Sequence, residues 1–140
     1  MQVKIDTREK FTVFTPDTVE LSDNLTEQLI SIITPYQQND IKNVVLNLKN
    51  VSAVDDMAAG RLTKMQQQAY ESNASFVICE IQNSVEEKLE ELELLDLLNI
   101  TPTESEAWDI VQMEEIEREL LDGDDVEFNT LDDEEKEVKE

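Results

Sequence analysis

The fold is decided by the stretch between residues 44 and 56, which reads Val44-Val45-Leu46-Asn47-Leu48-Lys49-Asn50-Val51-Ser52-Ala53-Val54-Asp55-Asp56. Its first five residues form a nearly continuous apolar run, which is typical of a strand covered on both faces in a parallel sheet. A short loop follows, and two carboxylates stand where a helix begins. The first turn of a helix has unpaired N–H groups and a partial positive charge, so it accepts an oxygen side chain. We therefore expect Asp55 or Asp56 to cap this helix.

Two strands and a helix are expected ahead of this stretch. Residues 3–14 alternate in part and suit two short strands. Pro16 then ends the second strand, because proline supplies no donor to a sheet. From Ser22 or Asp23 the apolar residues recur at spacings of three and four, which predicts a helix that frays or kinks at Pro35. Its apolar face holds Leu25, Leu29, Ile32, Ile33 and Tyr36.

Three further helices and another buried strand are expected after the stretch. One helix starts near Asp56, and the strand follows at 76–79. Capping-box patterns, in which Glu follows Ser or Thr by three residues, mark helix starts at Ser84 and Thr103, and the last helix runs to about Leu121. The expected inner faces, helix by helix, are Ala58, Leu62, Met65 and Ala69; Val85, Leu89, Leu92, Leu95 and Leu98; and Ala107, Ile110, Met113, Ile116 and Leu120. Strands alternating with helices predict an α/β fold with a mostly parallel sheet.

The composition argues against several classes of function. The chain has 34 acidic and 11 basic residues, a formal net charge of −23. Such a surface repels phosphate backbones and anionic lipids, so nucleic acid and membrane are poor partners and basic proteins better ones. The chain has no histidine, only two glycines and a single cysteine. This composition disfavours imidazole catalysis, zinc sites and Gly-rich phosphate loops. We expect no enzyme activity, no catalytic residue, no metal and no cofactor, and we expect Cys79 to be a core residue.

The charge changes along the chain, which divides it in two. We expect one domain over 1–122. Residues 123–140 hold nine acids and two lysines, so we expect a disordered tail that serves as a solubilising segment or docks a basic partner. No apolar run approaches the ~20 residues of a membrane span, and no signal peptide is visible. The expected location is the cytoplasm.

With its flanking elements, the stretch 44–56 resembles the STAS domain family, whose best-known members are anti-sigma factor antagonists of bacterial stress and sporulation signalling. The family pattern is an apolar strand, a Leu-Asn/Asp-Leu step, a short loop, then Asp-Ser-Ser-Gly opening a helix. Residues 44–48, Val51, Val54 and Asp55 match it, and the order of elements agrees from about residue 3 to 112. The resemblance implies a bacterial protein with a mixed, mostly parallel sheet of four to five strands and about four helices.

The chain departs from this family at the residue that carries its switch. In the family, a partner anti-sigma factor that is also a kinase phosphorylates the first serine of the motif, and the phosphorylated form no longer binds it. By position that serine falls on Asp56, the second serine on Met57 and the glycine on Ala58. Aspartate carries one permanent charge, against about −1.5 to −2 for phosphoserine. Three interpretations stay open: Asp56 imitates the phosphorylated state, the partner accepts an acid there, or Asp56 only caps the helix.

The resemblance therefore predicts a regulatory protein-binding module that is not switched by phosphorylation at Asp56. Its expected partner is an anti-sigma factor or similar serine-kinase-like protein, or another regulatory protein. The expected contacts lie at the helix start and in the loop 15–22, at Asp55, Asp56, Met57, Ala58, Gly60, Arg61, Asp17, Thr18 and Glu20. The alternative is a STAS subunit with a structural role and no switch, in a stressosome-like or lipid-transport complex. The oligomeric state stays open.

Overall fold

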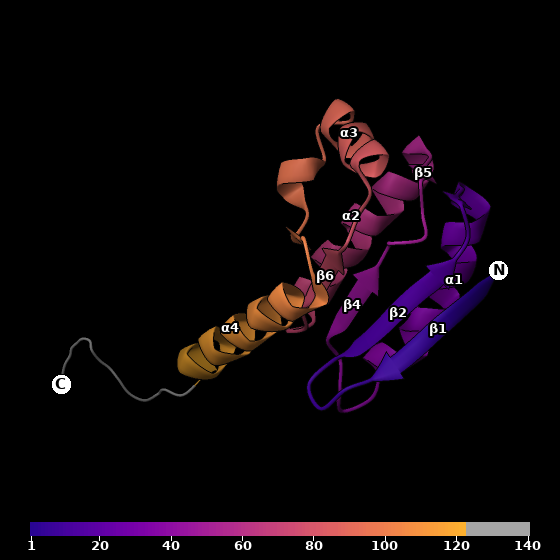
Figure 1. Cartoon of the computed structure of the whole chain (residues 1–140). Coiled ribbons are helices and arrows are strands. Elements are labelled where there is room, and N and C mark those ends of the chain that lie inside the picture. Colours follow the sequence, from indigo (N-terminus) through magenta and orange to yellow (C-terminus); the bar gives the residue numbers. More distant parts are fainter. Residues whose placement is uncertain (123–140) are drawn as a thin grey trace.

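The computed structural model describes residues 1–122, so the predicted tail lies outside the described residues. Five strands form its main sheet in the spatial order β1-β2-β4-β6-β7. Their bounds are Gln2–Thr7 for β1, Thr12–Asp17 for β2, Val44–Asn47 for β4, Phe76–Cys79 for β6 and Ile100–Thr101 for β7. β1 is antiparallel to β2, and the other neighbours are parallel. The predicted mixed, mostly parallel α/β sheet is confirmed (Figure 1).

Helices cover both faces of this sheet. Their bounds are Asp23–Gln37 for α1, Asp56–Glu71 for α2, Asn83–Glu91 for α3 and Glu104–Asp122 for α4, with a short 3-10 turn, η1, at Leu95–Leu97. Successive side chains of a strand point to opposite faces. Val44 and Leu46 of β4 lie in a core with α1, α2 and α3, whereas Val45 lies in a second core beneath α4. The central strands are therefore buried on both sides, as the apolar run predicted.

Helices α1 and α2 follow the expected pattern closely. Ser22 is the N-cap of α1, and its Oγ accepts a hydrogen bond from the N–H of Leu25 (3.2 Å). The predicted inner face of α2 is buried: Ala58, Leu62, Met65 and Ala69. Pro35 lies inside α1, two residues before the helix ends at Gln37.

The prediction that Pro16 ends the second strand is wrong. β2 continues through Pro16 to Asp17, and Pro16 lies opposite Val3 of β1. On its other side β2 pairs with β4 only as far as Phe14. Beyond that residue β2 has one neighbouring strand, and at such an edge position a residue without an N–H is tolerated.

The start and the length of α3 also differ from the prediction. Gln82 occupies the N-cap without a side-chain hydrogen bond, and the Ser84 hydroxyl instead donates to the carbonyl of Ser52 (2.6 Å). The helix ends at Glu91 because Glu93 adopts a left-handed conformation, φ 62°. The N–H of Leu94 then donates to the carbonyl of Leu89 (2.9 Å), closing the helix end. Leu92, Leu95 and Leu98 therefore lie beyond α3.

The predicted Thr103 cap at the start of α4 is confirmed, but the predicted inner face is correct only for Ala107 and Ile110. The N–H of Glu106 donates to Thr103 Oγ1 (3.1 Å), and the Thr103 hydroxyl donates to the Glu106 carboxylate (3.1 Å). Ala107 and Val111 are buried against the sheet. Three of the five residues predicted to face inward are exposed: Met113, Ile116 and Leu120.

The core position of Cys79 agrees with expectation, and it makes the thiol unreactive. Cys79 is buried in β6, and burial raises the pKa of its thiol to about 12. Because burial disfavours the charged thiolate, the neutral thiol persists well above pH 8.

At pH 8 a thiol reagent should label Cys79 of the native chain no faster than the rate at which the structure opens to expose the thiol. In chain unfolded in urea, the reagent should label Cys79 within the mixing time. Absorbance of the released chromophore measures both rates. Full labelling of the native chain within the mixing time would contradict this burial.

The left-handed residue at the end of α3 gives a stability prediction. Glycine adopts this conformation without the strain of a side chain, so Glu93→Gly should raise the free energy of unfolding by about 0.5–1 kcal/mol. Glu87→Gly makes the same chemical change inside α3 and should lower it by about 1 kcal/mol. Urea unfolding followed by circular dichroism measures both. An equal fall in the free energy of unfolding in the two variants would refute the assigned end of α3.

Candidate functional site

The two segments predicted to contact a partner lie side by side. They are joined by a small parallel sheet of β3 (Glu20–Leu21) and β5 (Ala53–Val54). The carbonyl of Val19 accepts from the N–H groups of Ser52 (2.8 Å) and Ala53 (3.2 Å). The N–H of Asp55 donates to the carbonyl of Leu21 (3.2 Å). The loop and the start of α2, far apart in sequence, thus form one surface.

Asp55 is the residue that caps α2, and it also holds α1. Its Oδ1 accepts from the N–H of Ala58 (2.8 Å), which is the N-cap bond. Its Oδ2 accepts from the N–H of Asp23 (2.9 Å), the first residue of α1. One carboxylate therefore faces the positive ends of two helix dipoles, a favourable position for a negative charge. Asp55 has a structural role, and the interpretation of Asp56 as the helix cap is wrong.

Asp56 is more exposed than Asp55 and pairs with a lysine. It is the first residue of α2, and 68% of its side chain is exposed. Its Oδ1 lies 2.7 Å from Nζ of Lys88 on α3. The hydrogen bond to Asp56 raises the pKa of the Lys88 ammonium. The carboxylate of Asp56, to which the resemblance assigns the phosphoacceptor position, is therefore exposed and paired with a cation.

Arg61 of α2 pairs with two acids of α1. Its Nε donates to the Asp23 carboxylate, and a terminal nitrogen lies 3.4 Å from the Glu27 carboxylate. The hydrogen bond to Asp23 raises the pKa of the guanidinium. Arg61 is only partly exposed, so it fixes α2 against α1 as well as bordering the surface.

The other residues predicted to contact a partner differ in how far they are exposed. Ala58 is fully buried, so its side chain cannot touch a partner, contrary to prediction. Thr18 is half-buried and its hydroxyl donates to the carbonyl of Glu20 (3.0 Å), which shapes the loop. Gly60 is exposed, and a Cβ added there would meet no atom within 4 Å.

We call the exposed set the loop–helix surface, and it consists of Asp17, Val19, Glu20, Asp56, Met57 and Gly60. The sequence prediction missed Val19, although an apolar residue between polar neighbours in a loop was a usable signal. It also missed Lys88, because nothing local in α3 indicates a pairing with the start of α2. The surface presents exposed apolar groups among acids, an arrangement suited to recognising a protein.

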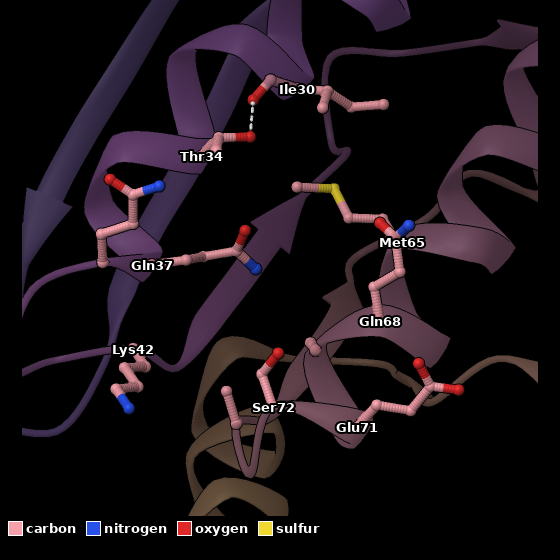
Figure 2. A pocket seen from close by; sticks show the side chains of 11 residues that line it. Ile30, Thr34, Gln37, Lys42, Met65, Gln68, Glu71 and Ser72 are labelled. Atoms are coloured by element: carbon pink, nitrogen blue, oxygen red, sulfur yellow. Dashed lines mark hydrogen bonds between the residues drawn. The ribbon is translucent and has the colours of Figure 1, made fainter.

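A separate hollow lies between the C-terminal halves of α1 and α2 and encloses about 430 Å³. Figure 2 shows its mostly uncharged lining of amides, hydroxyls and apolar groups, with Lys42 and Glu71 as its charged residues. The Thr34 hydroxyl donates to the carbonyl of Ile30 (2.7 Å), so it is engaged within its own helix. At 1.5 Å per residue, the hollow's α2 residues lie roughly 20 Å from Asp56 along the helix. It is not part of the loop–helix surface.

Two further features of residues 1–122 bear on function. No three His, Cys, Asp or Glu side chains in this region gather in a group that would hold a metal ion. No helix in it has both the length and the apolar character needed to span a membrane.

The contrast between the two adjacent acids gives a stability prediction. Asp55→Ala removes the acceptor of two helix-terminal N–H groups and should lower the free energy of unfolding by about 1–3 kcal/mol. Asp55→Asn keeps one oxygen acceptor, so it should lower the free energy of unfolding by less than Asp55→Ala does. Asp56→Ala removes only an exposed pair and should leave stability nearly unchanged. Urea unfolding of the three variants compares them; equal effects at positions 55 and 56 would contradict the double cap.

Comparison with known proteins agrees with this geometry. The family model of the STAS domain matches residues 3–107. Among solved structures, a candidate anti-sigma factor antagonist from Thermotoga maritima has 18% identity, with 79% of this chain and 94% of that chain covered and a TM-score of 0.71. A serine-to-glutamate variant of RsbS from Moorella thermoacetica has 17% identity, coverage of 84% and 99%, and a TM-score of 0.68. The anti-sigma factor antagonist SpoIIAA in its unphosphorylated form has 18% identity, coverage of 80% and 97%, and a TM-score of 0.63.

At these identities the structural likenesses show the fold alone. No curated protein sequence matches the chain. The family model, however, covers well over half of the 140 residues. The order of the strands, the helices on both faces of the sheet and the acid-capped start of α2 agree with that match. The chain belongs to the STAS domain family.

Proposed function

We propose that this chain is a cytoplasmic bacterial regulator that binds an anti-sigma factor, or a related serine-kinase-like protein, through the loop–helix surface. It acts by occupying its partner and carries out no chemistry. It is not switched by phosphorylation at position 56. The contact residues are Asp56, Met57 and Gly60 of α2 with Asp17, Glu20 and the added Val19 of the loop.

The proposal depends on a single observation, which is that residue 56 is an exposed aspartate. Its carboxylate is exposed at the start of α2, where the resemblance puts the phosphoacceptor. The side chain has no hydroxyl that a serine kinase could modify. The surface around it is nevertheless intact, with the loop held on β5 by main-chain hydrogen bonds. These facts support the proposal of a partner-binding surface without its usual switch.

The Lys88 pairing favours one of the three interpretations of Asp56. A phosphoserine would add about −1.5 to −2 charges and three acceptor oxygens. Asp56 adds one charge, and the Lys88 ammonium 2.7 Å away offsets it. The net field at this point is therefore much weaker than that of a phosphorylated relative. We infer that Asp56 does not imitate the phosphorylated, non-binding state, and that the partner accepts an acid there.

Binding and phosphorylation are tested together with the full chain and a serine-kinase-type anti-sigma factor from the same genome. Calorimetry should show binding, and incubation with Mg-ATP should leave the chain unphosphorylated by mass spectrometry. Gly60→Arg puts a long side chain on the surface without a clash inside the protein, and it should weaken binding at least tenfold. Asn39→Arg, an exposed site after the C-terminal end of α1, carries the same charge change and should have no effect.

Two outcomes would refute the proposal. One is equal binding by the Gly60→Arg and Asn39→Arg variants, which would remove the loop–helix surface from the contact. The other is phosphate incorporation mapped to Ser52 or Thr63, which would restore a switch at a neighbouring hydroxyl.

The second candidate function is a structural STAS subunit of a larger complex, and the missing hydroxyl at position 56 favours it equally. The variant Asp56→Ser separates the two candidates. Under the regulatory proposal the new serine should be phosphorylated by the anti-sigma factor, and binding should then fall. A structural subunit should show neither change, and native extracts should contain it in a particle far larger than one chain by size-exclusion chromatography.

A further inference from the structure

Helix α4 is attached to the sheet by polar contacts in addition to the apolar contacts of Ala107 and Val111. Asn47 Nδ2 donates to the Glu104 carboxylate (2.9 Å), and Asn43 Nδ2 donates to the Glu115 carboxylate (2.7 Å). The Ser75 hydroxyl donates to the Glu114 carboxylate (2.5 Å). These bonds join α4 to β4 and to the residues that precede β4 and β6.

These polar contacts fix the rotation of α4 about its own axis. Asn43, Asn47 and Ser75 are each less than 5% exposed, and buried polar groups of this kind need hydrogen-bond partners. Turning the helix would take an acceptor from each of them. Asn43 would keep its bond to the carbonyl of Lys10, whereas Asn47 Nδ2 and the Ser75 hydroxyl would be left unsatisfied at a cost of about 1–3 kcal/mol each. The fold therefore holds Glu104, Glu114 and Glu115 inward and cannot bury the opposite side of α4.

That opposite side carries an apolar stripe. Met113 is 61% exposed, Ile116 56% and Leu120 72%. At 100° per residue these three lie within a 60° arc on the helix, roughly opposite the buried Ala107 and Val111. Figure 1 shows the C-terminal half of α4 projecting beyond the sheet, in agreement with the exposure of these three side chains in the described part of the chain. We call Met113, Ile116 and Leu120 the outer stripe.

The charges beside the outer stripe determine what can cover it. α4 contains eight acidic residues and one basic residue, Arg118. Arg118 is turned inward, with its terminal nitrogens 3.4 Å from Ser75 Oγ and Asn43 Oδ1. Four acids are exposed beside the stripe, namely Glu106, Asp109, Glu117 and Glu119, and the uncharged Gln112 and Leu121 are exposed there as well. The surface is apolar in the middle and negative at its edges.

This charge pattern disfavours three occupants. A second copy would bring an equally acidic helix, an anionic membrane would bring like charge, and residues 123–140 hold nine acids against two lysines. It suits a helix with apolar side chains at spacings of three and four and Lys or Arg on both flanks. We propose that the outer stripe of α4 docks a basic amphipathic helix of a partner protein. The site lies on the sheet face opposite α1 and α2, so it is independent of the loop–helix surface.

The probe for this site is a synthetic 18-residue helix of Leu and Lys, with Leu at helical spacing and a fluorescent label. Anisotropy titration with the full chain should show binding that weakens with salt. The double variant Ile116→Gln/Leu120→Gln keeps the net charge of −23 and should bind at least tenfold more weakly. Tyr70→Gln, at another exposed apolar position on α2, should bind like the unaltered chain. Circular dichroism checks that each variant is folded.

Control peptides separate a specific site from general attraction between opposite charges. A peptide of the same composition with the Leu spacing scrambled should bind at least tenfold more weakly, and so should a Leu/Glu helix with the same apolar face. Equal binding of the Leu/Lys helix to the double variant would overturn the proposal. Self-association of the unaltered chain that the double variant abolishes, seen by analytical ultracentrifugation, would overturn it in favour of a second copy.

Discussion

The carboxylate of Asp55 is the constraint on which the rest of the loop–helix surface depends. Its two oxygens accept from the first N–H of α1 and from the N–H of Ala58 in α2, so a single side chain fixes both helix starts. Arg61 adds a second tie between the same helices through Asp23. Because the loop before α1 is hydrogen-bonded to the strand before α2, the exposed residues on both segments keep one arrangement. The surface is therefore preorganised, and a partner does not have to order it on binding.

Much of this could be predicted from the sequence, and the remainder depended on contacts distant in the chain. The apolar run at 44–48 and the spacing in α2 defined a covered strand and a helix, and both are present. The sequence alone left Asp55 and Asp56 equivalent as caps, because either acid satisfies the local rule. The N–H of Asp23, 32 residues away, distinguishes them. In the same way the Ser84 hydroxyl left its predicted cap role for the carbonyl of Ser52, a partner that no local pattern contains.

The error on α4 has a different cause. Hydrophobic periodicity assumes that the surface beneath a helix is apolar. Here the residues beneath α4 include the buried polar groups Asn43, Asn47 and Ser75, which need hydrogen-bond partners. The carboxylates of α4 supply them, and satisfying those groups outweighs the burial of three exposed apolar side chains. Asn47 falls within the covered strand itself, so a polar residue in such a strand was the available sign that the helix above it would be oriented by hydrogen bonds.

A net charge of −23 raises the question of how this chain could be selective at all, because it attracts any basic protein. Long-range charge accelerates encounter and sets the sign of the partner, but it distinguishes poorly between partners of the same sign. Selectivity must then come from apolar side chains held in fixed positions among the acids. The two proposed surfaces that provide such anchors have Val19 and Met57 on one and the outer stripe on the other. Each is fixed by partly buried hydrogen bonds rather than by the anchors' own packing. Under the two proposals the acids of this chain have two separate roles: those on the surface attract partners, and those bonded inward hold the apolar anchors where a partner can meet them.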